Sequence, residues 1–224
     1  MADLNYEKTV KLLETLQSRY PYGRYAQQAL MDIAYANYKQ NEPEAALAAA
    51  DRFIKQFPNS EVLDYIYYLK GLVNFNDNAG FFSRLTRQDP AERDPQTLRE
   101  SFDSFRELVT RYPDSLYAED AKLRMQFLIN TLSRSDIQIA SYYLRRGAYI
   151  AAVNRANNVL KVYPQTRQTR DALQILVLAY DAMGQKQLRD DAQRVLDLNI
   201  AKDGIKPGIK DTVQASGSWW QFWL

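Results

Sequence analysis

The sequence predicts an all-α fold in which helical hairpins stack into a superhelix, and two observations carry this prediction. An aromatic residue precedes proline four times, and each pair closes one run of helical pattern: Tyr20-Pro21, Phe57-Pro58, Tyr112-Pro113 and Tyr163-Pro164. The residues around the first and third pairs are nearly the same, RYPYGRYAQQAL at 19–30 and RYPDSLYAEDAKL at 111–123. A helix-ending unit that recurs in this way is typical of helical repeat proteins.

The first three helices are predicted from apolar spacing and from proline. Residues 5–19 carry apolar side chains three and four positions apart, which is the spacing of one helix face. Tyr20 ends this helix because Pro21 disfavours α geometry in the residue before it. A second helix is predicted over 24–40, and a third over 43–56, where the leading proline suits the first helical turn.

This order of helix, short turn, helix and aromatic-proline pair is the tetratricopeptide (TPR) pattern. It predicts a TPR-type helical-hairpin superhelix (α-solenoid) with about four and a half repeats. The interval from Pro21 to Pro58 is close to the usual period of about 34 residues. The next interval is longer because residues 76–94 follow a helix predicted over 59–75. A connection of this length is unusual inside a helical array and is often functional.

The C-terminal half continues the pattern. Helices are predicted over 95–111, 115–146, 148–162, 167–183 and 185–199, with turns at Gly147 and Gly184. The second of these is unusually long, and we expect it to bend near Ser133–Ser135. The expected organisation is one superhelix over 1–200, made of N-terminal repeats (5–75), the long loop (76–94) and C-terminal repeats (95–200), followed by a tail (201–224).

The composition argues against an enzyme. The 224 residues include no Cys and no His, which removes disulfides, thiol catalysis, His-based triads and nearly every zinc site. No segment supplies the carboxylate pair that glycoside cleavage requires. We therefore expect no catalytic, metal or cofactor site. The net charge of +2 is too small an excess to indicate a nucleic-acid partner.

The sequence shows no membrane-spanning segment. No apolar stretch approaches the about 20 residues that cross a bilayer, and the start, MADLNYEKTV, has no signal-peptide pattern.

Tyrosine is abundant, with 16 residues, and much of it lies on the first helices of the predicted pairs. In a TPR superhelix these helices line the concave face, where extended peptides bind, and tyrosine offers a large rigid contact area with a hydroxyl. The candidates for a peptide groove are Tyr25, Tyr35, Arg52, Tyr65, Tyr68 and Phe82. The alternative for the aromatic residues is packing between helices, and for Arg52 it is an ordinary surface ion pair.

Three tryptophans lie close together near the C-terminus: Trp219, Trp220 and Trp223. This much apolar surface is costly to leave in water, and tryptophan is frequent at protein hot spots and membrane interfaces. We expect these residues to anchor the tail on a partner or a lipid interface; the alternative is packing on the last helices of the chain itself.

Several longer segments resemble one family, the BamD/ComL outer-membrane lipoproteins of the β-barrel assembly machinery. They are RYPYGRYAQQA (19–29), ALAAADRFIKQFP (46–58), DYIYYLKGLVNF (64–75), ERDP (92–95), FRELVTRYPDSLYAEDAKLRM (105–125) and YYLRRGAYIAAVNRANNVLKVYP (142–164). The resemblance implies five TPRs on the periplasmic face of the outer membrane, held there by a lipidated N-terminal Cys. This chain lacks that Cys, the signal peptide and the first helix of the first repeat.

The resemblance also implies partners and roles. The Arg of the VNR motif in this family contacts the fifth POTRA domain of BamA, and it corresponds to Arg155. Arg145 and Arg146 are further candidates for this contact. Repeats over 5–75 would receive the C-terminal targeting strand of unfolded outer-membrane proteins, repeats over 115–200 would dock on BamA, and other lipoproteins of the machinery would be partners. The alternative is a generic TPR interaction scaffold of the cytoplasm or cell envelope.

Overall fold

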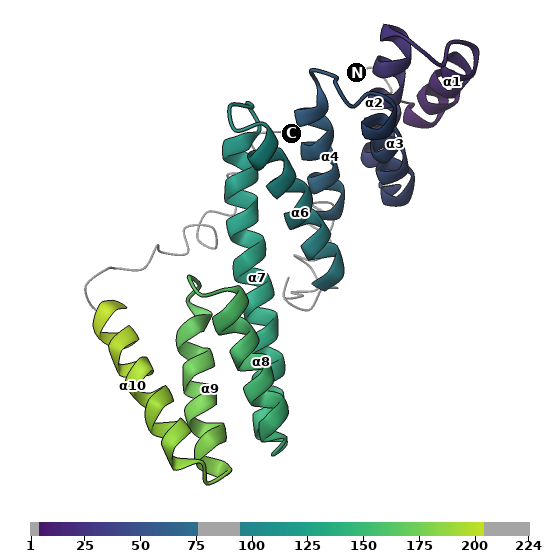
Figure 1. Cartoon of the computed structure of the whole chain (residues 1–224). Helices are drawn as coiled ribbons and strands as arrows, with labels where there is room; N and C mark the ends of the chain where they lie inside the picture. Colours follow the sequence, from purple (N-terminus) through teal and green to yellow (C-terminus); the bar gives the residue numbers. More distant parts are fainter. Residues whose placement is uncertain (1–4, 76–94, 204–224) are drawn as a thin grey trace. The chain divides into compact units, whose positions relative to one another are not determined.

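The computed structural model of the chain describes residues 5–75 and 95–203, and every regular element in these ranges is an α-helix (Figure 1). The helices are α1 (Tyr6–Arg19), α2 (Arg24–Lys39), α3 (Pro43–Gln56), α4 (Leu63–Phe75), α6 (Pro95–Arg111), α7 (Ala118–Arg145), α8 (Tyr149–Val162), α9 (Gln168–Ala182) and α10 (Lys186–Asp203). The all-α prediction is confirmed, and each predicted helix is present with its ends shifted by no more than about one turn. The loop at 76–94, which includes Phe82, and the tail with Trp219, Trp220 and Trp223 lie outside the described residues.

The chain divides into two compact units, Met1–Leu128 and Ile129–Leu224, and the boundary falls inside α7. α7 is one continuous helix across this boundary and across Ser133–Ser135, where the sequence predicted a bend. The arrangement of repeats over 1–200 around the loop at 76–94 stays a prediction. None of the helices in the described ranges is long and apolar enough to cross a membrane.

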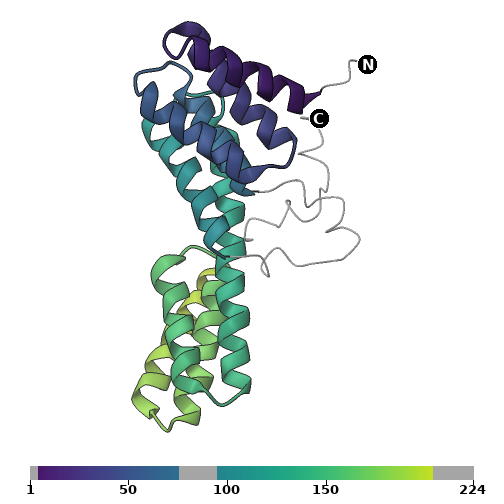
Figure 2. The same cartoon turned by 90° about the vertical axis from the view of Figure 1, so that its right-hand side faces the viewer.

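The first unit is built from consecutive helices that pack on one another, α1 on α2, α2 on α3, α3 on α4 and α4 on α6 (Figure 2). The buried positions of α2 and α3 are mostly alanine: Ala26, Ala29, Ala34 and Ala36 on α2, and Ala46, Ala49 and Ala50 on α3. Small side chains let two helix backbones approach closely. Phe53, which is fully buried, fills the remaining space.

The aromatic-proline pairs end their helices in the same way each time. The aromatic residue donates its backbone N–H to the carbonyl four residues earlier: Tyr20 to Leu16 at 2.9 Å, Phe57 to Phe53 at 2.9 Å, Tyr112 to Leu108 at 2.8 Å and Tyr163 to Val159 at 2.8 Å. The proline that follows has no N–H to continue the ladder. The recurring dipeptide is therefore a recurring helix stop.

The turn after three of these pairs also repeats. The carbonyl of the aromatic residue accepts a backbone N–H from the hydroxyl-bearing residue three positions later: Ser60 to Phe57 at 3.1 Å, Ser115 to Tyr112 at 3.1 Å and Thr166 to Tyr163 at 3.2 Å. The second, third and fourth pairs therefore share one turn geometry ahead of the next helix.

α4 and α6 approach very closely at Gly71. An added Cβ at Gly71 would lie 2.3 Å from Cε1 of Phe105, whose side chain is fully buried. The Ser101 hydroxyl donates to the Gly71 carbonyl at 2.9 Å across the same contact. Only glycine leaves room for this packing.

The second unit holds the C-terminal part of α7 with α8, α9 and α10. Its core is again rich in small residues, and its buried members include Ala140, Ala152, Ala156, Ala172, Ala179 and Ala192. The predicted turns are confirmed: Gly147 and Gly184 have φ of +74° and +71°, a left-handed conformation that glycine adopts without strain.

Candidate partner-binding surfaces

The candidate tyrosines for a peptide-binding surface in the first unit lie on α2 and α4. Tyr35 is 39% exposed on α2, and Tyr65 is half-buried on α4. Burial raises the pKa of the Tyr65 phenol well above its ordinary value, and Tyr35 and Tyr117 add to this effect as near neighbours. α2 and α4 contact each other, so Tyr35 and Tyr65 lie on neighbouring helices. That these side chains line one groove stays a prediction.

Tyr25 and Arg52 are not joined to this surface by any contact found in the described residues. Tyr25 is 76% exposed and lies ten residues before Tyr35, about 15 Å away along α2. Arg52 is exposed on α3, and its Nη1 lies 3.4 Å from Oε1 of Gln17 on α1. Both residues stay candidates by sequence alone.

Tyr68 is held firmly in place by its neighbours. Its hydroxyl donates to Oδ2 of Asp120 at 2.6 Å, and its ring stacks on Tyr117 with the centroids 4.8 Å apart. Nε of Arg124, a side chain only 8% exposed, donates to the same Asp120 oxygen at 2.5 Å. The guanidinium of Arg124 also lies over the ring of Phe75, 4.9 Å from its centroid. Tyr68 thus packs between helices, which is the alternative to a place in the peptide groove that the sequence left open.

The buried tyrosines predict a loss of stability in alkali. Burial raises the pKa of Tyr65 and, together with the Asp120 hydrogen bond, that of Tyr68. An unfolded tyrosine ionises near pH 10, so the contribution of these groups is fully present below that pH and is lost as the pH rises above it. We expect the urea concentration at the midpoint of unfolding to decrease as the pH is raised from 9 to 11.

Replacing Tyr65 and Tyr68 with phenylalanine removes the ionising hydroxyls and so isolates their contribution to the pH dependence. The Tyr65→Phe, Tyr68→Phe double variant should show a shallower fall over the same pH range, whatever its absolute stability. Tyr22→Phe, at a side chain that is 87% exposed, serves as the control. Equal slopes for the double variant and the wild type would contradict the assignment.

Arg155 lies at the centre of a polar cluster in the second unit. Its Nη1 donates to Oδ1 of Asp136 on α7 at 3.0 Å, and Nδ2 of Asn158 donates to the other carboxylate oxygen at 2.8 Å. The Asp136 side chain is 6% exposed and that of Arg155 is 44% exposed. Arg155 is therefore partly exposed on α8, but it is also bonded to a buried partner.

Arg145 and Arg146 are exposed at the end of α7 and do not join this cluster. Nε of Arg146 donates to the hydroxyl of Tyr142 at 3.2 Å, and its guanidinium lies 5.6 Å from the centre of that ring. Arg145 lies nine residues beyond Asp136 on the same helix, about 13 Å away. The three arginines thus occupy two separate positions.

Sequence reasoning missed Asp136, Asn158, Asp120 and Arg124. One signal could have found Asp136: it lies four residues after Leu132 and four before Ala140, both buried, so it falls on the buried face of α7. A charged residue on a buried face needs a partner, so its presence there indicates a cation on a neighbouring helix.

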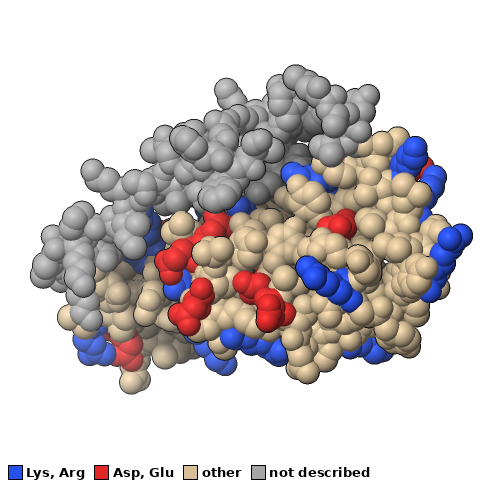
Figure 3. Space-filling view, turned by 90° about the horizontal axis from the view of Figure 1, so that it is seen from above, with Lys and Arg blue, Asp and Glu red and all other residues tan. Residues whose placement is uncertain are grey.

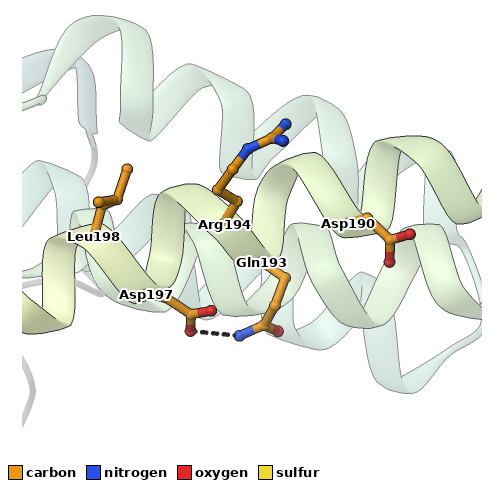
Figure 4. Close-up of a pocket in the computed structure, with 5 residues that line it drawn as sticks. All are labelled: Asp190, Gln193, Arg194, Asp197 and Leu198. Carbon is orange, nitrogen blue, oxygen red and sulfur yellow. Dashed lines mark hydrogen bonds between the residues drawn. The ribbon is translucent and has the colours of Figure 1, made fainter.

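A shallow hollow of about 460 Å³ lies on α10 and is lined by Asp190, Gln193, Arg194, Asp197 and Leu198 (Figure 4). Nε2 of Gln193 donates to Oδ1 of Asp197 at 2.8 Å, and Asp190 pairs with Arg189 at 2.7 Å. The lining side chains come from one helix, and its carboxylates already have partners.

Charged side chains do not form a single-sign patch on the face shown in Figure 3, where acidic and basic groups occur side by side. This agrees with the small net charge of +2. Recognition of a polyanion needs a concentrated basic surface.

Comparison with known proteins identifies the family. A family model described as an outer membrane lipoprotein, YfiO, matches residues 1–195. The chain is 44% identical over 220 residues to the outer membrane protein assembly factor BamD of Neisseria meningitidis, an alignment that covers 98% of this chain and 81% of the relative.

More distant relatives carry the same name. BamD of Vibrio cholerae is 38% identical over 85% of this chain and 79% of its own length. BamD of Haemophilus influenzae is 34% identical over 88% of this chain and 76% of its own length. The matches cover nearly all of the helical part of the chain. The chain belongs to the BamD family of outer membrane lipoproteins.

Proposed function

We propose that the chain is a non-enzymatic adaptor in the assembly of outer-membrane β-barrel proteins, working at the periplasmic face of the outer membrane. One observation carries this proposal: the 44% identity, over 98% of the chain, to a relative named as an assembly factor for outer membrane proteins. Membrane attachment would come from an N-terminal lipid, as in the lipoprotein family that matches. Family membership favours this role over that of a generic scaffold.

The first unit would bind the C-terminal strand of unfolded barrel precursors. Tyr35 and Tyr65 lie on the neighbouring helices α2 and α4, and both keep part of their surface in water. A tyrosine ring buries apolar area at a low entropic cost, and its hydroxyl can bond to an extended backbone. Tyr68 would support this surface from beneath through its bond to Asp120.

The second unit would dock on the periplasmic POTRA domains of BamA through Arg155. Its guanidinium is 44% exposed and carries further N–H groups besides the one bonded to Asp136. A guanidinium fork matches the geometry of a carboxylate on a partner. Arg145 and Arg146 would add contacts at the end of α7, and other lipoproteins of the machinery would bind elsewhere on the chain.

Calorimetric titration tests both contacts separately. We expect the wild-type chain to bind purified POTRA domains of BamA and, in a second titration, a synthetic peptide with the C-terminal strand of a barrel precursor. Tyr35→Ala with Tyr65→Ala should weaken peptide binding and leave POTRA binding unchanged. Tyr142→Ala, at an exposed tyrosine of the second unit, is the matched control for the peptide. Absence of binding to both partners would refute the proposed function.

A further inference from the structure

We propose that Asp136 is a positioning residue for the POTRA-binding surface: its buried carboxylate holds Arg155 in one orientation, ready to receive a carboxylate of the partner. This inference rests on the proposed function and extends it to a residue that never needs to touch the partner itself.

The geometry of the cluster supports this role. Asp136 uses one oxygen for Nη1 of Arg155, at 3.0 Å, and the other for Nδ2 of Asn158, at 2.8 Å. Arg155 and Asn158 lie three residues apart on α8, so both project from the same helix face. With both oxygens engaged from α8, the carboxylate has little freedom to rotate and can hold the guanidinium at a fixed place.

The two side chains of this ion pair differ in their exposure to solvent. The Asp136 side chain is 6% exposed, whereas that of Arg155 is 44% exposed. A partner can therefore reach the guanidinium but has little access to the carboxylate. Since a buried charge needs compensation, Asp136 keeps Arg155 close even when no partner is bound.

A fixed guanidinium has an advantage in binding. A long arginine side chain loses rotamer freedom when a partner immobilises it, and this loss weakens association. In this chain the loss occurs on folding, because Asp136 already orders the side chain. Arg146 offers a contrast: it rests on the exposed ring of Tyr142 at the end of α7. Of the three arginines proposed to contact POTRA domains, Arg155 is the one that, within the described part of the chain, bonds to a buried carboxylate.

Asp136→Asn tests the proposal because it keeps the shape and removes the charge. We expect it to weaken POTRA binding about tenfold, since an ordered rotamer-rich side chain is worth roughly one such factor in affinity. Asp181→Asn is the matched control: it removes a carboxylate paired with Arg189 at 2.9 Å between α9 and α10 of the same unit. The control should leave affinity unchanged.

A mutant cycle separates positioning from a purely structural role. In an Arg155→Ala background, Asp136→Asn should weaken binding no further, because there is no guanidinium left to position. An equal loss in both backgrounds would show that Asp136 acts on the fold and not through Arg155. Unchanged affinity of the single Asp136→Asn variant would also overturn the proposal.

Nuclear magnetic resonance of the free wild-type chain gives a readout that needs neither a partner nor a folded variant. With ¹⁵N-labelled arginine, the side-chain Nε–H of Arg155 should be rigid on the nanosecond timescale, and that of exposed Arg145 should be mobile. Equal mobility of the two would refute positioning even if POTRA binding is found. Conversely, a rigid Arg155 in a chain that does not bind POTRA domains would refute only the proposed function.

Discussion

Arg155→Ala should weaken binding to the POTRA domains of BamA by about 30- to 5000-fold, the largest functional effect that we expect from one substitution. Truncating one partner of a close charged pair at an interface typically costs about 2–5 kcal/mol. The loss should appear mainly in the dissociation rate, which surface plasmon resonance measures directly. Arg146→Ala should have a much smaller effect, because Arg146 rests on the exposed Tyr142 and not on a buried carboxylate.

We choose alanine at position 155 because Arg155 is paired with the buried Asp136. Arg155→Glu would set a second carboxylate against Asp136 and so confuse loss of binding with loss of local structure. The double variant Asp136→Asn, Arg155→Gln removes both charges together, and it should keep its helicity and midpoint while still failing to bind. POTRA affinity within twofold of the wild type for Arg155→Ala would contradict the assignment.

Gly71→Ala should lower the free energy of unfolding of the first unit by about 1–3 kcal/mol, the cost of overpacking a well-filled core. The added Cβ would lie 2.3 Å from the ring of Phe105, which is itself fully buried. α4 and α6 would have to separate, and the bond from Ser101 to the Gly71 carbonyl would lengthen. Urea unfolding followed by circular dichroism measures the change.

A compensating substitution identifies the cause. Phe105→Leu opens space opposite Gly71 and should destabilise the unit by itself. The double variant Gly71→Ala, Phe105→Leu should then lose less than the two single losses added together, because the new methyl group occupies the vacated space. Simple additivity would show that the two residues do not meet in the folded chain.

The helices could be predicted because their signals are local. Proline after Tyr20, Phe57, Tyr112 and Tyr163 removes a backbone donor next to the residue where the ladder ends, whatever the rest of the chain does. The turns at Gly147 and Gly184 are equally local, since a left-handed φ selects glycine. These signals act over a few residues, so they are readable without tertiary structure.

The contacts that define the surfaces could not be predicted in the same way. Tyr68 bonds to Asp120, 52 positions later, and Arg155 bonds to Asp136 on another helix. Such partners depend on how helices turn about their axes when they pack, and a single sequence leaves that rotation open. The resemblance singled out Arg155, but it gave no indication that a buried carboxylate lies behind it.

The sequence pattern gives even less information about which partner each surface binds. The surface at Tyr35 and Tyr65 is recognisable only once α2 and α4 are placed together. Phe82 and the three tryptophans of the tail lie outside the described residues, so their predicted roles stay predictions.

Order-of-addition calorimetry tests the central claim, that one chain serves as an adaptor between a precursor and BamA. The chain is first saturated with POTRA domains and is then titrated with the precursor peptide. The account predicts that the peptide binds the complex with one-to-one stoichiometry and with an affinity close to that for the free chain, because the two contacts lie in different units. A peptide that displaces the POTRA domains, or that no longer binds once they are present, would contradict it.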